Sequence, residues 1–389
     1  SRAALLTGCY PQRVGIPWVL GPEGPDWTKG RSNVGLNPDE QTIAELLKTK
    51  DYATAAIGKW HLGHHEPHLP TKHGFDEFFG IPYSNDMWPE DNPAYKPLTL
   101  LQNDIVVDTI KTLEDQAELT GLFTQKAIEF MTKNQHQPFF LYLAQPMPHV
   151  PINASNDFLG SSGKGLYADV ILEIDAGIGK ILETVDILEL QENTLVIFTT
   201  DNGPWLVYGD HAGSAAPFRE GKLTTFEGGV RVPFIAKWPG KIEAGSQSAE
   251  VTGLIDLLPT LVEVAEVSLP ALEIDGRSIW SLLSDKSKKT PRDVHYFFFD
   301  ENLEAIRKGK WKLHLPHSYG SVEKAGNGGA KGVGITKEIE LSLFDLETDP
   351  AESINVANEN EEVVQELKDL AEKFSSDMEK NKRKAGISE

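Results

Sequence analysis

Helix and strand patterns alternate through roughly the first 290 residues, and this alternation limits the possible folds more than any other feature of the sequence. Apolar residues recur at helical spacing over residues 166–185, and a short apolar run follows at residues 194–200. The same order occurs earlier, where helix patterns from residue 37 and over residues 116–132 precede apolar runs at residues 52–57 and 139–144. Helices that repeatedly alternate with short apolar strands predict an α/β fold, in which helices flank both faces of a mainly parallel sheet.

Polar residues follow three of these apolar runs. Lys59 and His61 come after the first, His149 comes after the second, and Asp201 and Asn202 come after the third. In parallel sheets the ligand site lies beyond the carboxyl ends of the strands, where loops from several strands converge. We therefore expect these side chains to meet at one edge of the sheet.

The pattern changes after about residue 290, where aromatic and polar residues alternate over residues 295–299 and 305–315. A glycine-rich loop at residues 320–334 and a short apolar run at residues 343–346 follow, and residues 361–380 have the pattern of a charged amphipathic helix. These features predict a small antiparallel sheet with a terminal helix packed on the main unit. The predicted division is a catalytic unit at residues 1–290 and a smaller unit at residues 291–389.

The charge balance excludes some classes of partner. The chain has 37 basic and 58 acidic residues, a formal net charge of -21, which repels nucleic acid and anionic lipid. An anionic substrate would need a local cluster of positive charge. The most apolar stretch, residues 253–267, is interrupted by Asp256, Pro259 and Glu263, so no membrane span is expected. The single cysteine, Cys9, excludes an internal disulfide framework.

The most specific motif is DYATAAIGKWHLG at residues 51–63. Lys59 and His61 are two positions apart, so in an extended segment they would point to the same side. An ammonium and an imidazole that face one point can bind an anionic oxygen and protonate a leaving alkoxide. A solvated lysine and a surface histidine are the usual alternative, but the apolar strand before them favours a functional pair.

A second motif, TTDNGP at residues 199–204, ends an apolar strand. Asp201 and Asn202 offer hard oxygen ligands of the kind that suit calcium or magnesium. Asp-Asn-Gly is also a good turn sequence, so the motif gains weight mainly from its position after the strand.

These motifs resemble those of the sulfatase family, in particular the branch of arylsulfatase A and N-acetylgalactosamine-6-sulfatase. Residues 51–63 match the family pattern Gly-or-Asp, Tyr, any residue, Thr, two residues, Ile, Gly, Lys, aromatic, His almost throughout. The opening SRAALLTG resembles the first family signature, which matches at Ser1, Arg2, Thr7 and Gly8. The resemblance covers nearly the whole chain and implies an alkaline-phosphatase-like fold.

The resemblance implies a nucleophile three residues before Ser1, converted by a maturation enzyme to formylglycine. Free N–H groups and the dipole at a helix N-terminus would stabilise its developing negative charge. The resemblance also implies Ca²⁺, with Mg²⁺ the less favoured ion, bound by Asp201, Asn202 and two acidic residues further upstream. On this basis the 389-residue chain by itself is expected to be inactive, and the full-length protein is expected in the periplasm or secreted.

The resemblance further assigns roles to individual side chains. His149 is expected to protonate the departing alcohol, and His61 to help release sulfate and restore the aldehyde. The expected catalytic and substrate-binding residues are Arg2, Lys59, His61, His149 and Lys222, and Ser84 and His211, with Asp86 a weaker candidate. His314 or His317 could reach the site, and Trp18, Trp27 and Trp88 could stack on sugar rings or simply pack.

The expected activity is hydrolysis of sulfate esters of a sulfated carbohydrate. Two alternatives stay open. A phosphodiesterase or phosphonate hydrolase of the same superfold would use similar groups, and parallel assays with aryl sulfate and aryl phosphate would separate it. A protein that binds sulfated glycans without turnover is the other, and the identity of the residue three places before Ser1 would decide it.

Overall fold

The largest sheet has five strands, in the order β5-β4-β3-β2-β6. The computed structural model describes residues 1–285 and 288–388. The strands are β2 (Ala53–Lys59), β3 (Glu77–Ile81), β4 (Leu98–Gln102), β5 (Ile105–Ile110) and β6 (Phe139–Ala144). β2 pairs in parallel with β3 and β6, whereas β4 and β5 extend the sheet in antiparallel fashion. The sheet is therefore mixed, and its parallel part is the part that the sequence predicted.

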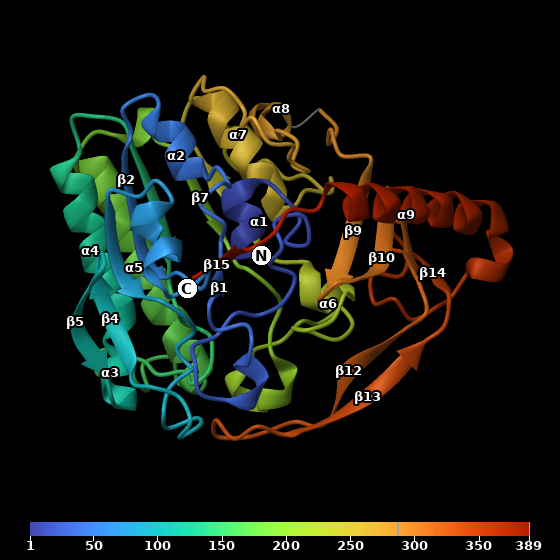
Figure 1. Cartoon of the computed structure of the whole chain (residues 1–389), viewed down its shortest axis with the longest axis horizontal. Helices are drawn as coiled ribbons and strands as arrows, with labels where there is room; N and C mark the ends of the chain where they lie inside the picture. Colours follow the sequence, from blue (N-terminus) through green and yellow to red (C-terminus); the bar gives the residue numbers. More distant parts are fainter. Residues whose placement is uncertain (286–287, 389) are drawn as a thin grey trace.

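Helices cover both faces of this sheet (Figure 1). α4 (Leu119–Lys133) contacts β2 and β6 and packs against α5 (Leu166–Ile187) on one side. α1 (Arg2–Thr7), α2 (Ile43–Lys48) and α7 (Leu257–Val264) pack together on the other side. The short helix α3 (Leu113–Ala117) leads into α4, and α8 (Trp280–Ser284) lies beside α7.

Successive side chains of β2 enter two different cores. Ala55 and Ile57 pack in one core with Phe123 of α4, whereas Ala56 packs in the other with Leu258 of α7. Because side chains alternate between the faces of a strand, a strand buried on both faces is apolar almost throughout. This is why the run before Lys59 is continuous rather than alternating.

Glycines let the ends of β2 and β3 approach closely. A Cβ added at Gly80 would lie 1.8 Å from the carbonyl oxygen of Gly58. Any side chain at residue 80 would therefore push β3 away from the end of β2, next to Lys59. The position of Lys59 thus depends on a glycine in the neighbouring strand.

The first predicted helix begins later than expected. Asn37 and Pro38 precede the helix, and α2 begins at Ile43. Thr42 accepts a hydrogen bond from the backbone N–H of Glu45 at 3.3 Å, and the Glu45 carboxylate accepts one from the backbone N–H of Thr42 at 2.7 Å. This capping box fixes the helix start more strongly than the Asn-Pro pair, so the predicted start was wrong.

β7 (Val196–Thr199) pairs with β8 (Phe234–Lys237) in a separate antiparallel ribbon. The sequence predicted β7 but not β8. Phe198 and Ile235 on this ribbon are partly exposed, at 38% and 61%. β7 nevertheless ends at Thr199, the first residue of the TTDNGP motif, as the apolar run indicated.

The C-terminal part forms a four-stranded antiparallel sheet in the order β14-β11-β10-β9. Its strands are β9 (Val294–Phe299), β10 (Asn302–Lys308), β11 (Trp311–His314) and β14 (Ser342–Asp345). The single strand predicted at residues 305–315 is in fact two, because the chain turns at Gly309, which has φ 56°. α9 (Glu361–Asn381) packs on this sheet through a shared apolar cluster.

A long hairpin and a returning strand join this part to the rest of the molecule. The hairpin consists of β12 (His317–Lys324) and β13 (Val333–Ile339), and it extends away from the four-stranded sheet (Figure 1). The last strand, β15 (Gly386–Ile387), pairs with β1 (Val34–Gly35) in the first part of the chain. In the described part of the chain, no helix is long and apolar enough to cross a membrane.

These elements confirm the predicted α/β class with a smaller antiparallel sheet and a terminal helix. The boundary between residues 290 and 291 stays a prediction. Residues 286–287 and 389, which the two predicted units include, lie outside the described residues.

Candidate active site

One large cleft brings together eight of the nine residues assigned to the site. It is lined by Arg2, Lys59, His61, Ser84, His149, Asp201, Asn202 and Lys222. These residues come from α1, from the segments that follow β2, β3, β6 and β7, and from the loop before α6 (Glu227–Val230). The loops thus converge at one edge of the sheet, as expected for polar residues that follow its strands.

Lys59 is the last residue of β2 and is only 5% exposed. Its ammonium donates a hydrogen bond to Ser84 Oγ at 2.9 Å. The Arg2 guanidinium donates to the carbonyl oxygen of Lys59 and, at 3.2 Å, to the hydroxyl of Tyr142. Burial and the nearby Arg2 charge lower the pKa of Lys59 to about 7.

His61 faces the cleft by a different route from the one predicted. β2 ends at Lys59, and His61 has φ 61°, so the segment is not extended. Its Nε2 lies 2.8 Å from the carbonyl oxygen of Leu20. Because a carbonyl only accepts, Nε2 carries the hydrogen and Nδ1 is left as the acceptor. Burial, followed by the charge of Lys59, lowers the pKa of His61 well below its usual value, so the ring is neutral.

His149 and Lys222 form the closest pair of catalytic candidates. His149 Nδ1 lies 2.7 Å from the carbonyl oxygen of Val150, so Nδ1 donates and Nε2 is the acceptor. Lys222 Nζ lies 2.6 Å from that Nε2 and therefore donates to it. Burial, then the charges of Lys59 and Lys222, lower the pKa of His149 to about 3. The transferable proton of this pair consequently lies on Lys222, whose own pKa is lowered by burial.

A buried amide fixes the loop that carries His149. Asn85 Nδ2 donates to the carbonyl oxygens of His149 and Pro151, at 3.2 Å and 3.3 Å, and to Gln116 Oε1 at 3.1 Å. Asn85 is fully buried. The sequence analysis passed over Asn85, because an Asn beside Ser84 and Asp86 reads as part of a turn.

Asp201 and Asn202 follow β7 and line the cleft. Burial would raise the pKa of Asp201, but the charges of Arg2, Lys59 and Lys222 outweigh burial and hold it well below the usual range. Asn202 Nδ2 donates to the carbonyl oxygen of Gly203 at 2.8 Å, which leaves its side-chain oxygen as a ligand. An ionised carboxylate and an amide oxygen fit a hard cation such as Ca²⁺.

The remaining predicted residues divide between the cleft and other places. Asp86 lines the cleft, and its Oδ1 lies 3.9 Å from His149 Nδ1. Trp18 and Trp27 also line it, whereas Trp88 is buried. His211 is not among the lining residues and lies beneath Gly329 in the hairpin.

Trp205 and Lys331 are among the lining residues that the sequence analysis did not single out. Trp205 lies between two lysines, with Lys222 Nζ 4.7 Å and Lys331 Nζ 5.6 Å from its ring centroid. Lys331 lies between β12 and β13, and the backbone N–H groups of Gly326 and Gly332 anchor that loop to the carbonyl oxygen of Val207 at 2.9 Å. The glycine-rich composition marked this loop, but only the fold brings it to the cleft.

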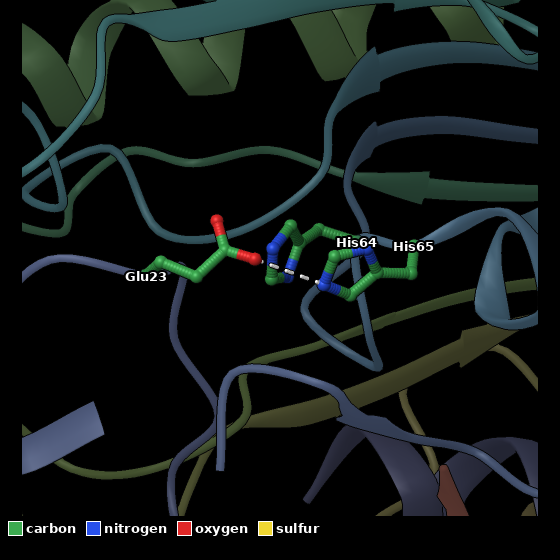
Figure 2. A group of neighbouring side chains, drawn as sticks. All are labelled: Glu23, His64 and His65. Atoms are coloured by element: carbon green, nitrogen blue, oxygen red, sulfur yellow. Dashed lines mark ion pairs between the residues drawn. The ribbon is translucent and has the colours of Figure 1, made fainter. Parts of the chain in front are cut away.

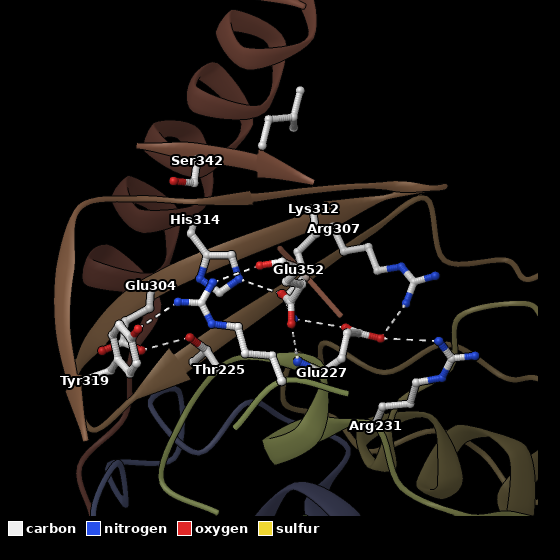
Figure 3. Close-up of polar contacts among 12 residues, drawn as sticks. Thr225, Glu227, Arg231, Glu304, Arg307, Lys312, His314, Tyr319, Ser342 and Glu352 are labelled. Carbon is white, nitrogen blue, oxygen red and sulfur yellow. Dashed lines mark hydrogen bonds and ion pairs between the residues drawn. The ribbon is translucent and has the colours of Figure 1, made fainter. Parts of the chain in front are cut away.

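His314 belongs to a buried ionic cluster, not to the cleft (Figure 3). His317 is partly buried, does not line the cleft either, and has its Nε2 3.4 Å from Glu304 Oε2. At the centre of the cluster Lys312 Nζ lies 2.9 Å from Glu227 Oε1 and 3.0 Å from Glu352 Oε1. His314 Nε2 lies 2.8 Å from the same Glu352 oxygen. Burial would raise the pKa of Glu352, but Lys312 and His314 lower it to about 2.

This cluster connects the C-terminal sheet to the segment that carries Lys222. Glu227 begins α6, five residues after Lys222, and its backbone N–H donates to Glu352 Oε2 at 2.6 Å. Arg219, three residues before Lys222, donates to the backbone oxygen of Glu352 at 2.8 Å. The Lys222 loop is therefore held on both sides by contacts to the C-terminal part.

Comparison with protein families agrees with this geometry. Residues 1–267 match the family described as Sulfatase, and residues 290–388 match the C-terminal region of aryl-sulfatase. Residues 221–316 also match the family described as N-sulphoglucosamine sulphohydrolase, C-terminal.

Individual relatives were found among curated proteins and among solved structures. Arylsulfatase A of Bos taurus is 39% identical over 393 residues, which cover 94% of this chain and 75% of that protein. N-acetylgalactosamine-6-sulfatase of Homo sapiens is 38% identical over 324 residues, which cover 81% of this chain and 62% of that protein.

The PsFucS1 sulfatase structure from Pseudoalteromonas sp. superposes on all of this chain and on 81% of its own, with a TM-score of 0.87 and 26% identity. The structure of Ps i-CgsB in complex with k-i-k-neocarrahexaose has a TM-score of 0.77 and 27% identity, over 98% of this chain and 82% of its own. The chain therefore belongs to the sulfatase family, in the branch of arylsulfatase A and N-acetylgalactosamine-6-sulfatase.

Proposed function

We propose that the full-length protein hydrolyses sulfate esters of a saccharide. The observation that carries this proposal is the convergence of Arg2, Lys59 and Lys222 around Asp201 in one cleft of a chain with a net charge of -21. Such a local cationic site in a negative protein favours a small anion over a polyanion surface. Two relatives support a saccharide as the group that carries the sulfate ester. One is named N-acetylgalactosamine-6-sulfatase, and the other was solved in complex with k-i-k-neocarrahexaose.

Lys59 and Ser84 are placed to hold the sulfate group. Their mutual hydrogen bond at 2.9 Å orients both side chains, and both residues are almost completely buried. A sulfate oxygen beside them would replace that contact with charge-assisted hydrogen bonds in a water-poor site. Arg2 fixes the backbone of Lys59 and adds positive charge close by.

The Lys222 and His149 pair is placed to protonate the leaving alcohol. Cleavage of the ester S–O bond leaves the electron pair on the sugar oxygen, which needs a proton. Lys222 holds such a proton 2.6 Å from His149 Nε2, and both side chains line the cleft. The acid is therefore the pair, with Lys222 as the source of the proton, rather than His149 alone.

His61 is placed to act as a base. It is neutral, and its Nδ1 is the free acceptor because Nε2 is bound to the carbonyl oxygen of Leu20. A formylglycine would supply the oxygen nucleophile, and a calcium ion held by Asp201 and Asn202 would polarise a sulfate oxygen. Export of the protein and its maturation by a formylglycine-generating enzyme are part of this proposal, and cell fractionation and mass spectrometry of the signature peptide test them.

The test is a parallel assay of the full-length protein with an aryl sulfate and the matching aryl phosphate. A higher kcat/KM for the sulfate is the expected result. Preference for phosphate would favour the phosphodiesterase or phosphonate hydrolase alternative. Binding of sulfated saccharides without any turnover of the mature protein would favour the binding-protein alternative.

Flat apolar side chains along the cleft favour a sugar as the leaving group. Trp18, Trp27 and Trp205 line it, and aromatic faces pack well on sugar rings. A panel of defined sulfated saccharides, assayed with the mature protein, would identify the sugar and the sulfated position. Turnover of aryl sulfates but of no saccharide in the panel would contradict the saccharide part of the proposal.

A further inference from the structure

A second group of potential metal ligands lies beside the active-site cleft. It consists of Glu23, His64 and His65, which Figure 2 shows pointing toward one another. One side-chain donor atom of each residue lies within 4.8 Å of the others. None of the three is among the residues that line the cleft, so the group is distinct from Asp201 and Asn202.

One buried ring nitrogen of the pair lacks a polar partner. The Nε2 atoms of His64 and His65 are both buried; that of His64 has no hydrogen-bond partner, whereas that of His65 faces the Glu23 carboxylate. Their rings are tilted by 38° with centroids 4.2 Å apart, and His65 Nε2 lies 3.2 Å from Glu23 Oε1. Leaving a buried polar atom unpaired costs about 1–3 kcal/mol, so the unpaired His64 nitrogen beside the His65 and Glu23 pair calls for a ligand.

The charge state of the group suits a cation. Two protonated imidazoles at this separation would repel each other, and burial together with His65 lowers the pKa of His64 to about 4. His64 is therefore neutral near pH 7 and offers a lone pair. Glu23 adds a negative charge, because Lys96 lowers the pKa of that carboxyl.

We propose that Glu23, His64 and His65 bind a transition-metal ion, Zn²⁺ in the first place. Two imidazole nitrogens and one carboxylate oxygen are borderline ligands that favour Zn²⁺ over Ca²⁺ or Mg²⁺. In a tetrahedral zinc site the ligand atoms are about 3.3 Å apart, with a water in the fourth position. The three ligand atoms lie within 4.8 Å of one another, so the bound ion would draw them closer together.

Neighbouring side chains hold the group in place. Lys96 Nζ lies 3.0 Å from Glu23 Oε2, so the second carboxylate oxygen is oriented while Oε1 faces His65. Tyr83 packs edge-on against His64, with ring centroids 5.8 Å apart. Such outer contacts orient metal ligands, although the charge of Lys96 opposes a cation and makes the site weaker than one built from three histidines.

The proposed ion would join two loops at the rim of the cleft. Glu23 lies three residues after Leu20, whose carbonyl oxygen binds His61, and four residues before Trp27. Trp27 Nε1 donates to the hydroxyl of Tyr95 at 3.1 Å, and both rings line the cleft. A metal bound to Glu23 and to His64 and His65 would thus restrain the loop that positions His61 and Trp27.

The test is a zinc titration of the full-length protein, first stripped with a chelator and then kept in excess CaCl₂ to occupy the hard-cation site. Isothermal titration calorimetry is expected to show one Zn²⁺ per chain. Co²⁺ in place of Zn²⁺ is expected to give the visible ligand-field absorption of a tetrahedral site. If the wild-type protein shows neither a heat of zinc binding nor the Co²⁺ absorption, the proposal is overturned, and bound water satisfies the ring nitrogens instead.

Variants decide which residues bind the ion. H65A and E23Q are each expected to weaken zinc binding by about 100-fold or more, and to remove the rise in Tm that zinc gives the wild type. Glu23 is 43% exposed in its side chain, so E23Q is expected to fold even if H65A does not. His136, an exposed histidine, gives the matched control H136A, which should bind like the wild type. Wild-type zinc affinity in both H65A and E23Q would also overturn the proposal.

Discussion

The contact between Lys222 Nζ and His149 Nε2, at 2.6 Å, decides which side chain supplies a proton in the cleft. His149 Nδ1 is held by the Val150 carbonyl oxygen, so the ring cannot easily turn to offer a proton from Nε2. A lysine beside a neutral histidine is consequently the acid of the pair. The identity of the leaving group then determines how much the pair contributes to the rate.

We predict that K222A in the full-length protein lowers kcat for a sulfated saccharide by about 10²–10⁴-fold. Nitrophenolate leaves without protonation, so kcat for 4-nitrophenyl sulfate should fall much less. Steady-state kinetics with both substrates measures the difference. K180A, at an exposed lysine on α5, is the control and should change neither value. Equal losses on both substrates would show that Lys222 only binds sulfate.

Lys59 predicts a pH dependence. Its pKa is lowered from 10.5 to about 7 by burial and by Arg2, so the free protein loses this positive charge as pH rises through about 7. Because sulfate binding needs the ammonium, kcat/KM is expected to fall over that range. K59R keeps its charge at all these pH values, so its remaining kcat/KM should lack the alkaline fall. If kcat/KM of K59R falls at alkaline pH just as in the wild type, the fall is due to the titration of another group.

At the scale of elements, the hairpin formed by β12 and β13 brings the C-terminal part to the cleft. Its tip is anchored to Val207 and carries Lys331 to the face of Trp205. Lys222 Nζ and Lys331 Nζ lie 4.7 Å and 5.6 Å from the centroid of the same Trp205 ring, so we expect Lys331 to hold a second anionic group on a larger substrate. The hairpin is thus a candidate for substrate selection.

We predict that K331A raises KM about tenfold for a saccharide with more than one anionic group, the factor for about 1.4 kcal/mol. It should leave kcat/KM for 4-nitrophenyl sulfate unchanged, since that substrate carries one anionic group. Kinetics on both substrates provides the comparison. An equal loss on the small substrate would place Lys331 at the reacting sulfate instead.

The buried cluster around Lys312 makes a prediction about stability. K312M leaves Glu227 and Glu352 buried without their common cation, and removal of one partner from a buried pair costs about 3–5 kcal/mol. Urea unfolding measures the loss. K308A is the matched control, because the side chains of the Lys308 pair with Glu366 are 35% and 50% exposed, and such a surface pair is worth about 0–1 kcal/mol. Similar losses of unfolding free energy in K312M and K308A would show that the buried cluster stabilises the protein no more than a surface ion pair does.

The elements also show what could be predicted from the sequence. β2, β6 and β7 were predictable because each is a short continuous apolar run, and the polar residues after them marked Lys59, His149 and Asp201. The start of α2 and the turn at Gly309 were missed, since local capping and one left-handed residue set them. These signals occupy one or two residues and are lost in a periodic pattern.

Residues that depend on distant pairing could not be predicted. β8 is short and half exposed, and its partner β7 lies 34 residues earlier in the chain. Trp205 and Lys331 meet only because the hairpin folds back over the loop after β7. His314 and His317 lie in strands, and their burial among carboxylates follows from packing between the two parts of the chain.

At the scale of the whole molecule, a protein with a negative net charge contains a cleft lined by clustered positive charges. Arg2, Lys59 and Lys222 come from three parts of the chain, the first and last 220 residues apart, and the C-terminal sheet holds Lys222 in place through Glu227. Their convergence is the feature on which the proposed chemistry rests.

The most direct measurement is a crystal structure of the full-length protein, inactivated at its nucleophile and bound to a sulfated saccharide. The account predicts that the sulfate lies between Lys59 and Lys222, with the ester oxygen facing the Lys222 and His149 pair. A sulfate bound elsewhere on the molecule, with both lysines free of it, would contradict the account.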